Sequence, residues 1–219
     1  MNNFIKVTYD ALVSKADIQR FLRTLNRKPL LAFDIETRSI YTPKDRDEAK
    51  ELLKTNLAGD YRQLCHVVAE SSGLSYPEII KTTHFVFSES ESHSTLLVTD
   101  DPNMELCVWY SLANYRGKLL IHNPCFDLKV MYQRTGMLPK DFEDTQAMAK
   151  CLTNHVDIWK AKTGLKELMA AYYHPEWGMV EDYEPEDLLD PKFLLYAATD
   201  AAACFHLYKM CLEYFDECE

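Results

Sequence analysis

Two carboxylates at the end of an apolar run are the first residues in this chain whose types and spacing could do chemistry. The run Leu30–Phe33 leads directly into Asp34, and Glu36 follows two residues later. Side chains alternate along a strand, so both carboxylates point to the same side, about 7 Å apart along the chain. Like charges this close repel each other unless a cation lies between them. The pair therefore predicts a divalent cation held through hard oxygen ligands.

Two more groups of polar residues stand where further ligands are needed. The apolar run Leu119–Ile121 is followed by Asn123 at a predicted strand-to-helix turn and by Asp127 in the first turn of that helix. Tyr196 and Asp200 are spaced i, i+4 on the last predicted helix, so both project from one otherwise apolar face. The turn, the helix and the first strand are expected to bring these groups together.

The elements that must position these residues alternate between helical and extended patterns. Apolar periodicity, caps and breakers predict the following elements. Helices are expected near 14–26, 102–115, 124–135, 144–152, 164–173 and 191–215, and strands near 5–9, 30–37, 83–87, 95–99 and 118–122. This order is typical of an α/β domain with a mixed sheet.

The segment between the first two motifs is expected to be a helical insertion. Residues 44–57 and 61–70 show amphipathic helical patterns, and the whole segment 38–81 is too short to build a core of its own. The prediction is therefore a single domain over 1–219, with this insertion after the strand that carries Asp34.

The composition limits the classes of function. The 219 residues are 47% hydrophobic and 26% charged, as in a soluble globular protein. A net charge of −10 argues against the broad basic surface of a nonspecific polyanion binder. Seven cysteines without a C-x-x-C pair or a secretory leader indicate reduced thiols. With no apolar run long enough for a membrane span, the expected location is the cytoplasm, or the host cytoplasm for a viral protein.

Taken together, the three motifs resemble a known family. Phe33–Thr37, Asn123–Asp127 and Tyr196–Asp200 match in order and spacing the three exonuclease motifs of the DEDD superfamily, in its tyrosine subtype. Asp144-Thr145 and the run Gly164–Leu168 are similar to features of the proofreading exonuclease domain of family A DNA polymerases. The resemblance covers most of residues 14–215. It implies a ribonuclease H-like fold with a mixed five-stranded sheet flanked by helices.

The chain departs from that family in two places. The 38–81 segment is longer than the family usually needs, and the chain ends at Glu219 without room for a polymerase palm. A stand-alone exonuclease, a separate proofreading subunit and an excised domain are all compatible with this ending.

The resemblance also implies a chemistry and a set of ligands. It implies hydrolysis of the terminal phosphodiester at a 3′ end by two Mg²⁺ or Mn²⁺ ions about 3.5–4 Å apart. Asp34, Glu36, Asp127 and Asp200 would be the metal ligands, with Asp34 bridging both ions. Tyr196 would orient the attacking water together with Glu36.

The same resemblance implies contacts to the substrate. Asn123 and Phe126 would hold the terminal nucleotide, by a hydrogen bond and by a ring contact respectively. Backbone groups of Thr37 would touch the 3′ end.

Each of these residues also has a structural interpretation. Taken alone, Asn123 and Asp127 are better explained as a turn residue and a first-turn acid that the helix dipole favours. Tyr196 could be a core tyrosine with its hydroxyl at the surface, and Asp144 is predicted to be a helix N-cap rather than a ligand. His122 is expected to be structural, because Tyr196 occupies the position at which the histidine subtype carries its base.

Three functions follow, in order of preference. The first is a 3′-5′ exonuclease that acts on single-stranded DNA ends in proofreading or end processing, with a separate DNA polymerase subunit as a conceivable partner. The second is an RNase D-like exoribonuclease, with RNA as substrate. The third is an inactive nucleic-acid-binding or scaffold module of the same fold, against which the presence of all four carboxylates and the tyrosine argues.

Overall fold

The computed structural model describes residues 6–39, 80–152, 162–174 and 187–217. Contacts divide the chain into two compact units, one formed by 1–36 with 83–219 and the other by 37–82. The strands are β1 (Thr8–Leu12), β2 (Leu30–Ser39), β3 (Ile80–Ser88), β4 (His93–Val98), β5 (Lys118–Ile121) and β6 (Phe142–Asp144). The helices are α1 (Lys15–Leu25), α4 (Pro102–Ala113), α5 (Cys125–Thr135), α6 (Thr145–Leu152), α7 (Leu165–Tyr172) and α8 (Pro191–Glu217).

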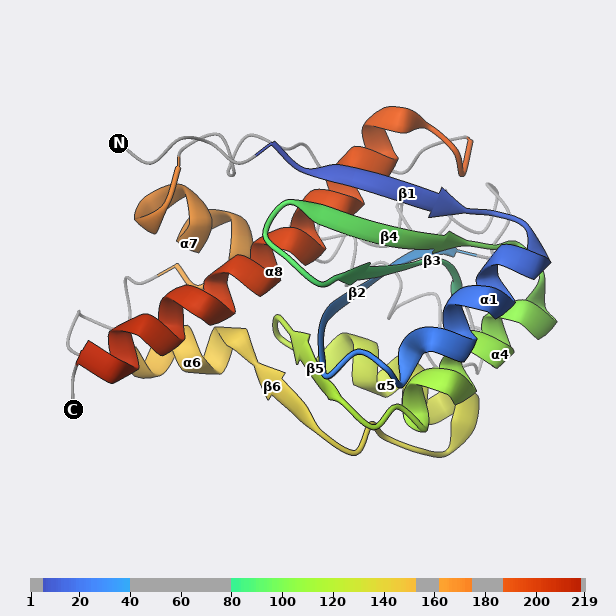
Figure 1. The fold of residues 1–219 in the computed structure, drawn as a ribbon, viewed down its shortest axis with the longest axis horizontal. Coiled ribbons are helices and arrows are strands. Elements are labelled where there is room, and N and C mark those ends of the chain that lie inside the picture. Colours follow the sequence, from blue (N-terminus) through green and yellow to red (C-terminus); the bar gives the residue numbers. More distant parts are fainter. Residues whose placement is uncertain (1–5, 40–79, 153–161, 175–186, 218–219) are drawn as a thin grey trace, which may run out of the picture. The chain divides into compact units, whose positions relative to one another are not determined.

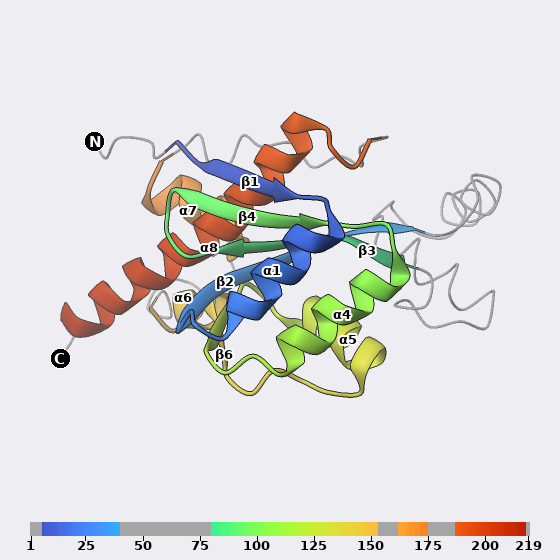
Figure 2. The same cartoon turned by 45° about the vertical axis from the view of Figure 1, so that its right-hand side comes forward.

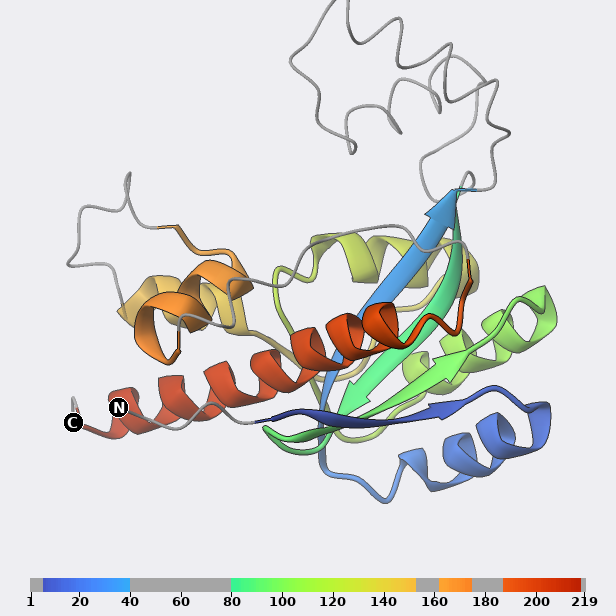
Figure 3. The ribbon, with the colours of Figure 1, turned by 90° about the horizontal axis from the view of Figure 1, so that it is seen from above.

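The described strands form one mixed sheet in the order β1-β4-β3-β2-β5-β6. β1 pairs with β4 in parallel, β4 and β3 form an antiparallel hairpin, and β5 lies parallel to both β2 and β6. Figure 3 shows β2 and β3 running side by side in opposite directions. The α/β class and the mixed sheet predicted from the sequence are confirmed, and β2 occupies the interior of the sheet.

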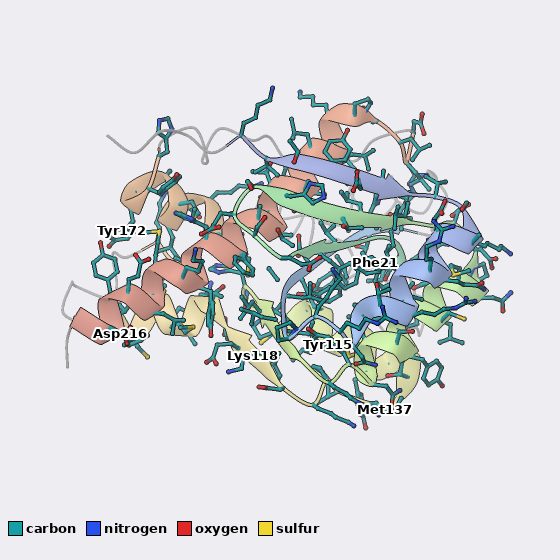
Figure 4. The ribbon with its side chains drawn as sticks, viewed as in Figure 1. Phe21, Tyr115, Lys118, Met137, Tyr172 and Asp216 are labelled. Atoms are coloured by element: carbon teal, nitrogen blue, oxygen red, sulfur yellow. The ribbon has the colours of Figure 1, made fainter. Side chains whose placement is uncertain are left out.

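One face of the sheet is closed by α1 and α4 through aromatic packing. Phe33 of β2 lies 5.4 Å from Phe87 of β3 and 6.1 Å from Trp109 of α4, between ring centroids. Phe21 of α1, labelled in Figure 4, packs against Phe87 with centroids 5.1 Å apart. Burial of large aromatic rings supplies much of the apolar stabilisation in a core of this kind. Because Phe33 points to this face, its neighbours Ala32 and Asp34 point to the other.

The opposite face is covered by α8, which crosses the sheet behind the strands in Figures 1 and 2. Its inner surface is lined with fully buried alanines, namely Ala197, Ala198, Ala201 and Ala202. Small side chains let the helix approach the strands closely, and Val86, Leu96 and Val98 pack in the same cluster. Ala32 of β2 packs with Leu120 of β5 and Cys204 of α8. The helix that carries Tyr196 and Asp200 therefore lies on the face to which Asp34 points.

The helix ends follow from local sequence. Ser14 caps α1 by accepting the Asp17 N–H at 3.1 Å, and Asp101 caps α4 with Pro102 in the first turn. Gly136 ends α5 with φ 70°, a left-handed conformation that glycine adopts without a steric cost. All three ends agree with the prediction from the sequence.

The predicted count of five strands is wrong by one. Phe142–Asp144 forms a sixth strand, paired with β5, at a place where the sequence predicted only a helix cap at Asp144. Three residues are too few to show a period-2 pattern, so the strand is defined by its partner and not by its own sequence. Asp144 also acts as the predicted cap, since its Oδ1 accepts the Gln146 N–H at 2.9 Å.

Other predictions lie outside the described residues. These are the two helices predicted within the 38–81 insertion, at 44–57 and 61–70. The single-domain assignment stays a prediction, beside the division into two units given above. In the part of the chain that the structure describes, no helix is both long and apolar enough to cross a membrane.

Candidate active site

Three carboxylates meet where β2 passes under α8. Asp34 and Glu36 come from β2 and Asp200 from α8, and one oxygen atom of each lies within 4.8 Å of the others. All three side chains are partly buried. Carboxylate oxygens are the ligands that Mg²⁺ and Mn²⁺ prefer, so this donor set fits a hard divalent cation. The alternation along β2 and the close approach of α8 produce the cluster.

Asp127 is the fourth carboxylate, and it reaches the site from the neighbouring strand. β5 lies parallel to β2, and α5 begins at Cys125, so its first turn carries Asp127 beside the cluster. The side chain is buried, and its charge acts on Asp34.

Burial and neighbouring charges shift the protonation of Asp34. Desolvation is the largest cause that raises the pKa of this carboxyl group well above its usual value, and repulsion by Asp127 and Asp200 adds to it. A hydrogen bond from the Ile35 backbone and the charge of Lys166 oppose the shift. The site therefore disfavours further negative charge, which is the electrostatic condition under which a divalent cation binds.

Lys166 of α7 contacts the carboxylate cluster through Asp200. Its Nζ lies 3.9 Å from Asp200 Oδ2 and 4.2 Å from the centroid of the Tyr196 ring. The position of α7 follows from two hydrogen bonds to the Thr163 carbonyl, donated by His122 Nε2 at 3.0 Å and Gln146 Nε2 at 3.1 Å. In the sequence, Lys166 belongs to the run Gly164–Leu168 that carries part of the family resemblance. Its contact with Asp200 was not predicted, because that contact depends on how α7 packs.

Tyr196 lies one turn before Asp200 on α8 and is 8% exposed. Its ring contacts Phe193 at 5.8 Å between centroids, as well as the Lys166 ammonium group. A cation over an aromatic face is attracted by the ring quadrupole. Lys166 thus contacts both the Tyr196 ring and Asp200, while the tyrosine ring also belongs to the buried apolar core, as its structural interpretation predicted.

The residues predicted to contact substrate lie in the last part of β2, just after β5 and in the first turn of α5. Thr37 follows Glu36 in β2 and is half-buried. Asn123 is exposed and has φ 57°, a left-handed conformation that asparagine tolerates better than most residues. Phe126 is half-buried in the first turn of α5. The backbone N–H of Asn123 donates to Asp144 Oδ1 at 3.1 Å, which joins the ends of β5 and β6.

His122 is structural, as the sequence predicted. Its Nδ1 contacts Thr145 Oγ1 at 3.0 Å, and its Nε2 contacts the Thr163 carbonyl at 3.0 Å. Burial lowers the pKa of this imidazole. With both ring nitrogens engaged, the side chain links β5, α6 and the start of α7.

Comparison with known proteins gives one family match within the chain. Residues 106–213 match a family model described as 3′-5′ exonuclease. This segment includes Asp127, Tyr196 and Asp200, while Asp34 and Glu36 precede it. No curated protein sequence matched this chain significantly.

Several solved structures share the fold. The Brucella melitensis NrnC structure with bound Mg²⁺ is 14% identical, with a TM-score of 0.55 over 97% of this chain and 83% of that one. Escherichia coli RNase D, described as an exoribonuclease involved in structured RNA processing, is 15% identical, with a TM-score of 0.56 over 96% and 46%. The Trypanosoma brucei RNase D complex with RNA U12 is 16% identical, with a TM-score of 0.55 over 94% and 62%.

These structural similarities, at such low identity, concern the fold, and the family model adds the activity. Residues 106–213 therefore match a family of 3′-5′ exonucleases, within a chain that shares its fold with structures of NrnC and RNase D. The activity that this match supports is that of a 3′-5′ exonuclease.

Proposed function

We propose that this protein removes nucleotides one at a time from the 3′ end of single-stranded DNA, using two divalent metal ions of the Mg²⁺ or Mn²⁺ type. The observation that carries the metal dependence is the convergence of Asp34, Glu36 and Asp200 within 4.8 Å. Asp127 completes a set of four carboxylates. Bound divalent ions would supply an activated water and neutralise charge that develops on the phosphate.

The chain's own residues have distinct roles in this proposal. Asp34 would be the ligand that serves both divalent ions. Glu36 and Asp200 would help to hold one ion, and Asp127 would help to hold the other. The Tyr196 hydroxyl and Glu36 orient the attacking water. Holding the water in this orientation accelerates the reaction, because the entropy cost of bringing the reactants together has already been met on binding.

The terminal nucleotide is held by residues at the strand ends. Asn123 donates or accepts a hydrogen bond through its side-chain amide, Phe126 contacts the terminal base or sugar through its ring, and Thr37 contacts the 3′ end through its backbone. Lys166 adds a positive charge at the position where a phosphate would approach Asp200. Contacts of this type are made to the sugar-phosphate backbone and to the faces of the bases, which all nucleotides share. Cleavage is therefore expected to be independent of the nucleotide sequence.

RNA is the second candidate substrate, and a specific observation favours it. Similar folds include an RNase D bound to RNA U12 and an NrnC bound to pGG. The DNA assignment instead rests on the motifs that resemble the proofreading domain of family A polymerases, with proofreading beside a polymerase subunit as the proposed setting.

One assay separates the two substrates. DNA and RNA oligonucleotides of identical sequence, labelled at the 5′ end, are incubated with Mg²⁺ or Mn²⁺ and with EDTA, and the products are resolved by single nucleotides. The DNA proposal predicts a ladder that shortens from the 3′ end and a higher kcat/KM for DNA. Preferential shortening of RNA would reassign the protein to the exoribonucleases.

The metal site is tested by Asp34→Ala. We expect hydrolysis to fall below detection while the folded state persists, because the change removes a ligand and also removes a source of repulsion. Circular dichroism and Mn²⁺ titration accompany the activity assay. An Asp34→Ala protein that still degrades oligonucleotides at the wild-type rate would show that the site lies elsewhere.

The role of the phenol is tested by Tyr196→Phe. Loss of an orienting hydroxyl is expected to lower kcat by about 10- to 100-fold and to leave Mn²⁺ affinity unchanged. Loss of Mn²⁺ binding in this variant would mean that Tyr196 supports the metal rather than the water.

A further inference from the structure

Side-chain hydrogen bonds attach α8 to the sheet at three places. Ser94 of β4 donates to the Ala198 carbonyl at 2.7 Å, and Tyr9 of β1 contacts the Pro191 carbonyl at 3.4 Å. The third bond joins His84 Nε2 of β3 to the Leu188 carbonyl, just before α8, at 2.9 Å. Of the three residues that make these bonds, only His84 also has a ring in contact with Phe193, whose own ring contacts that of Tyr196.

His84 is completely buried, and its hydrogen bonds determine its tautomer. The Leu188 carbonyl can only accept, so Nε2 carries the proton that is donated to it. In the neutral ring Nδ1 then accepts from the Thr83 hydroxyl at 2.9 Å. Thr83 Oγ1 also lies 3.4 Å from the Glu36 carbonyl oxygen. The His84 ring thereby joins Thr83 of β3 to the segment that leads into α8, and the single Thr83 hydroxyl proton, once given to Nδ1, is not available to the Glu36 carbonyl.

The imidazole ring also makes an aromatic contact in the direction of the active site. Its centroid lies 5.1 Å from that of Phe193 in a T-shaped arrangement. Phe193 in turn lies 5.8 Å from Tyr196. Side chains at this density restrain the rotamers of their neighbours. The position of the Tyr196 ring therefore depends on Phe193, and that of Phe193 depends on His84.

We propose that His84 is a positioning residue for the exonuclease reaction: its hydrogen bond to the Leu188 carbonyl holds the imidazole against Phe193, and Phe193 in turn holds the Tyr196 ring. The inference rests on the proposed water-orienting role of Tyr196. The two hydrogen bonds of His84 would by themselves fit a purely structural role. The contact of its ring with Phe193, and of Phe193 with Tyr196, connects it in addition to the proposed site of hydrolysis.

Three substitutions at His84 separate its contacts. His84→Gln places an amide N–H where Nε2 donates to Leu188, His84→Asn retains only a group near Nδ1, and His84→Leu retains neither. We expect kcat to fall about tenfold or more in His84→Leu, with KM and Mn²⁺ affinity unchanged, because small displacements of an orienting group cost rate rather than binding. His84→Gln is expected to recover most of the rate.

A matched control removes another anchor of α8. Tyr9→Phe deletes the hydrogen bond to Pro191 and leaves the Phe193–Tyr196 contact in place. It is expected to lower the melting temperature and to leave kcat within about twofold of wild type. An equal loss of kcat in Tyr9→Phe would overturn the proposal, since the effect would then belong to helix anchoring in general.

The decisive experiment is a double-mutant cycle with Tyr196→Phe. If His84 acts through the tyrosine hydroxyl, His84→Leu lowers kcat in the wild-type background and has little further effect in Tyr196→Phe. An undiminished factor in both backgrounds would overturn the inference. Wild-type kcat in Tyr196→Phe alone would instead reject the role of Tyr196 in the proposed function, which keeps the two failures distinct.

A second variant protects the test against misfolding. Phe193→Leu keeps both hydrogen bonds of His84 and removes the ring between it and Tyr196. If His84→Leu does not fold, the same cycle is measured with Phe193→Leu, whose loss of kcat is likewise expected to vanish in Tyr196→Phe. Unchanged kcat in a folded Phe193→Leu would overturn the proposed route.

Discussion

At the scale of residues, the site is defined by excess negative charge in a partly buried place. Asp34 shows this most clearly, because burial raises the pKa of its carboxyl group and Asp127 and Asp200 raise it further. Lys166 offsets part of the charge through Asp200. Residues arranged in this way destabilise the protein without a cation and become favourable with one, which is a signature of function rather than of stability.

The shifted pKa of Asp34 predicts a pH dependence of stability. The unfolded chain loses its proton near the usual value of 3.8, while the folded protein retains it at higher pH, so the folded state binds more protons above that value. In EDTA, the free energy of unfolding should therefore fall as pH rises through this window, by at most about 1.4 kcal/mol per pH unit from this group.

Asp34→Asn is expected to flatten that dependence, because an amide cannot ionise. Urea unfolding in EDTA at several pH values measures it. Asp216→Asn is the matched control, since this exposed aspartate lies at the C-terminal end of α8 in Figure 4. Parallel stability curves for wild type and Asp34→Asn would contradict the assignment of the shift to Asp34.

At the scale of elements, the approach of α8 to the sheet decides the geometry. Alanines line the inner face of this helix, and Ala32 of β2 lies opposite Cys204. Burial raises the pKa of the Cys204 thiol to about 12, so it remains a neutral packing group at physiological pH. A larger side chain on this face would increase the distance between Asp200 and Asp34.

The packing of α8 is tested by Ala201→Leu. Ala201 is completely buried, so overpacking is expected to lower the free energy of unfolding by about 1–3 kcal/mol. Activity should fall more than stability alone explains, because the helix that carries Tyr196 and Asp200 is displaced. Thermal unfolding and the oligonucleotide assay measure the two effects. Glu213→Leu, at an exposed position of the same helix, is expected to change neither by much.

At the scale of the whole molecule, charge limits how the protein holds its substrate. A net charge of −10, from 24 basic and 34 acidic residues, disfavours a long basic track for an extended run of phosphates. The protein is therefore expected to grip a short 3′ terminal segment.

The salt dependence of kcat/KM tests this. For single strands, the slope of log affinity against log salt is about −0.7 for each phosphate neutralised. We expect a slope that corresponds to fewer than about three phosphates on a 20-nucleotide substrate, measured between about 50 and 200 mM salt. A steeper slope, corresponding to five or more phosphates, would contradict this expectation and would indicate a basic track on the protein despite its net negative charge.

The sequence by itself determined the local features of this protein. The apolar run into Asp34 and Glu36 specifies a buried strand with two acids on one side, and Ser14, Asp101 and Gly136 specify helix ends through hydrogen bonds within a few residues. The order of the predicted helices and strands was sufficient to predict the α/β class, and the order and spacing of the three motifs gave the resemblance to the DEDD superfamily. These inferences succeed because alternation, periodicity and capping act over short distances along the chain.

Only the tertiary structure decided which distant groups meet. The contact of Lys166 with Asp200, the anchoring of α8 by His84 and the three-residue strand β6 all depend on partners far away in sequence. The contact of a partly buried lysine or the hydrogen bond of a buried histidine leaves no periodic pattern in the sequence, because one distant neighbour determines the residue type. The strand with two carboxylates was therefore evident from the residues, whereas its position under α8, which creates the carboxylate cluster, followed from how the sheet and helix pack.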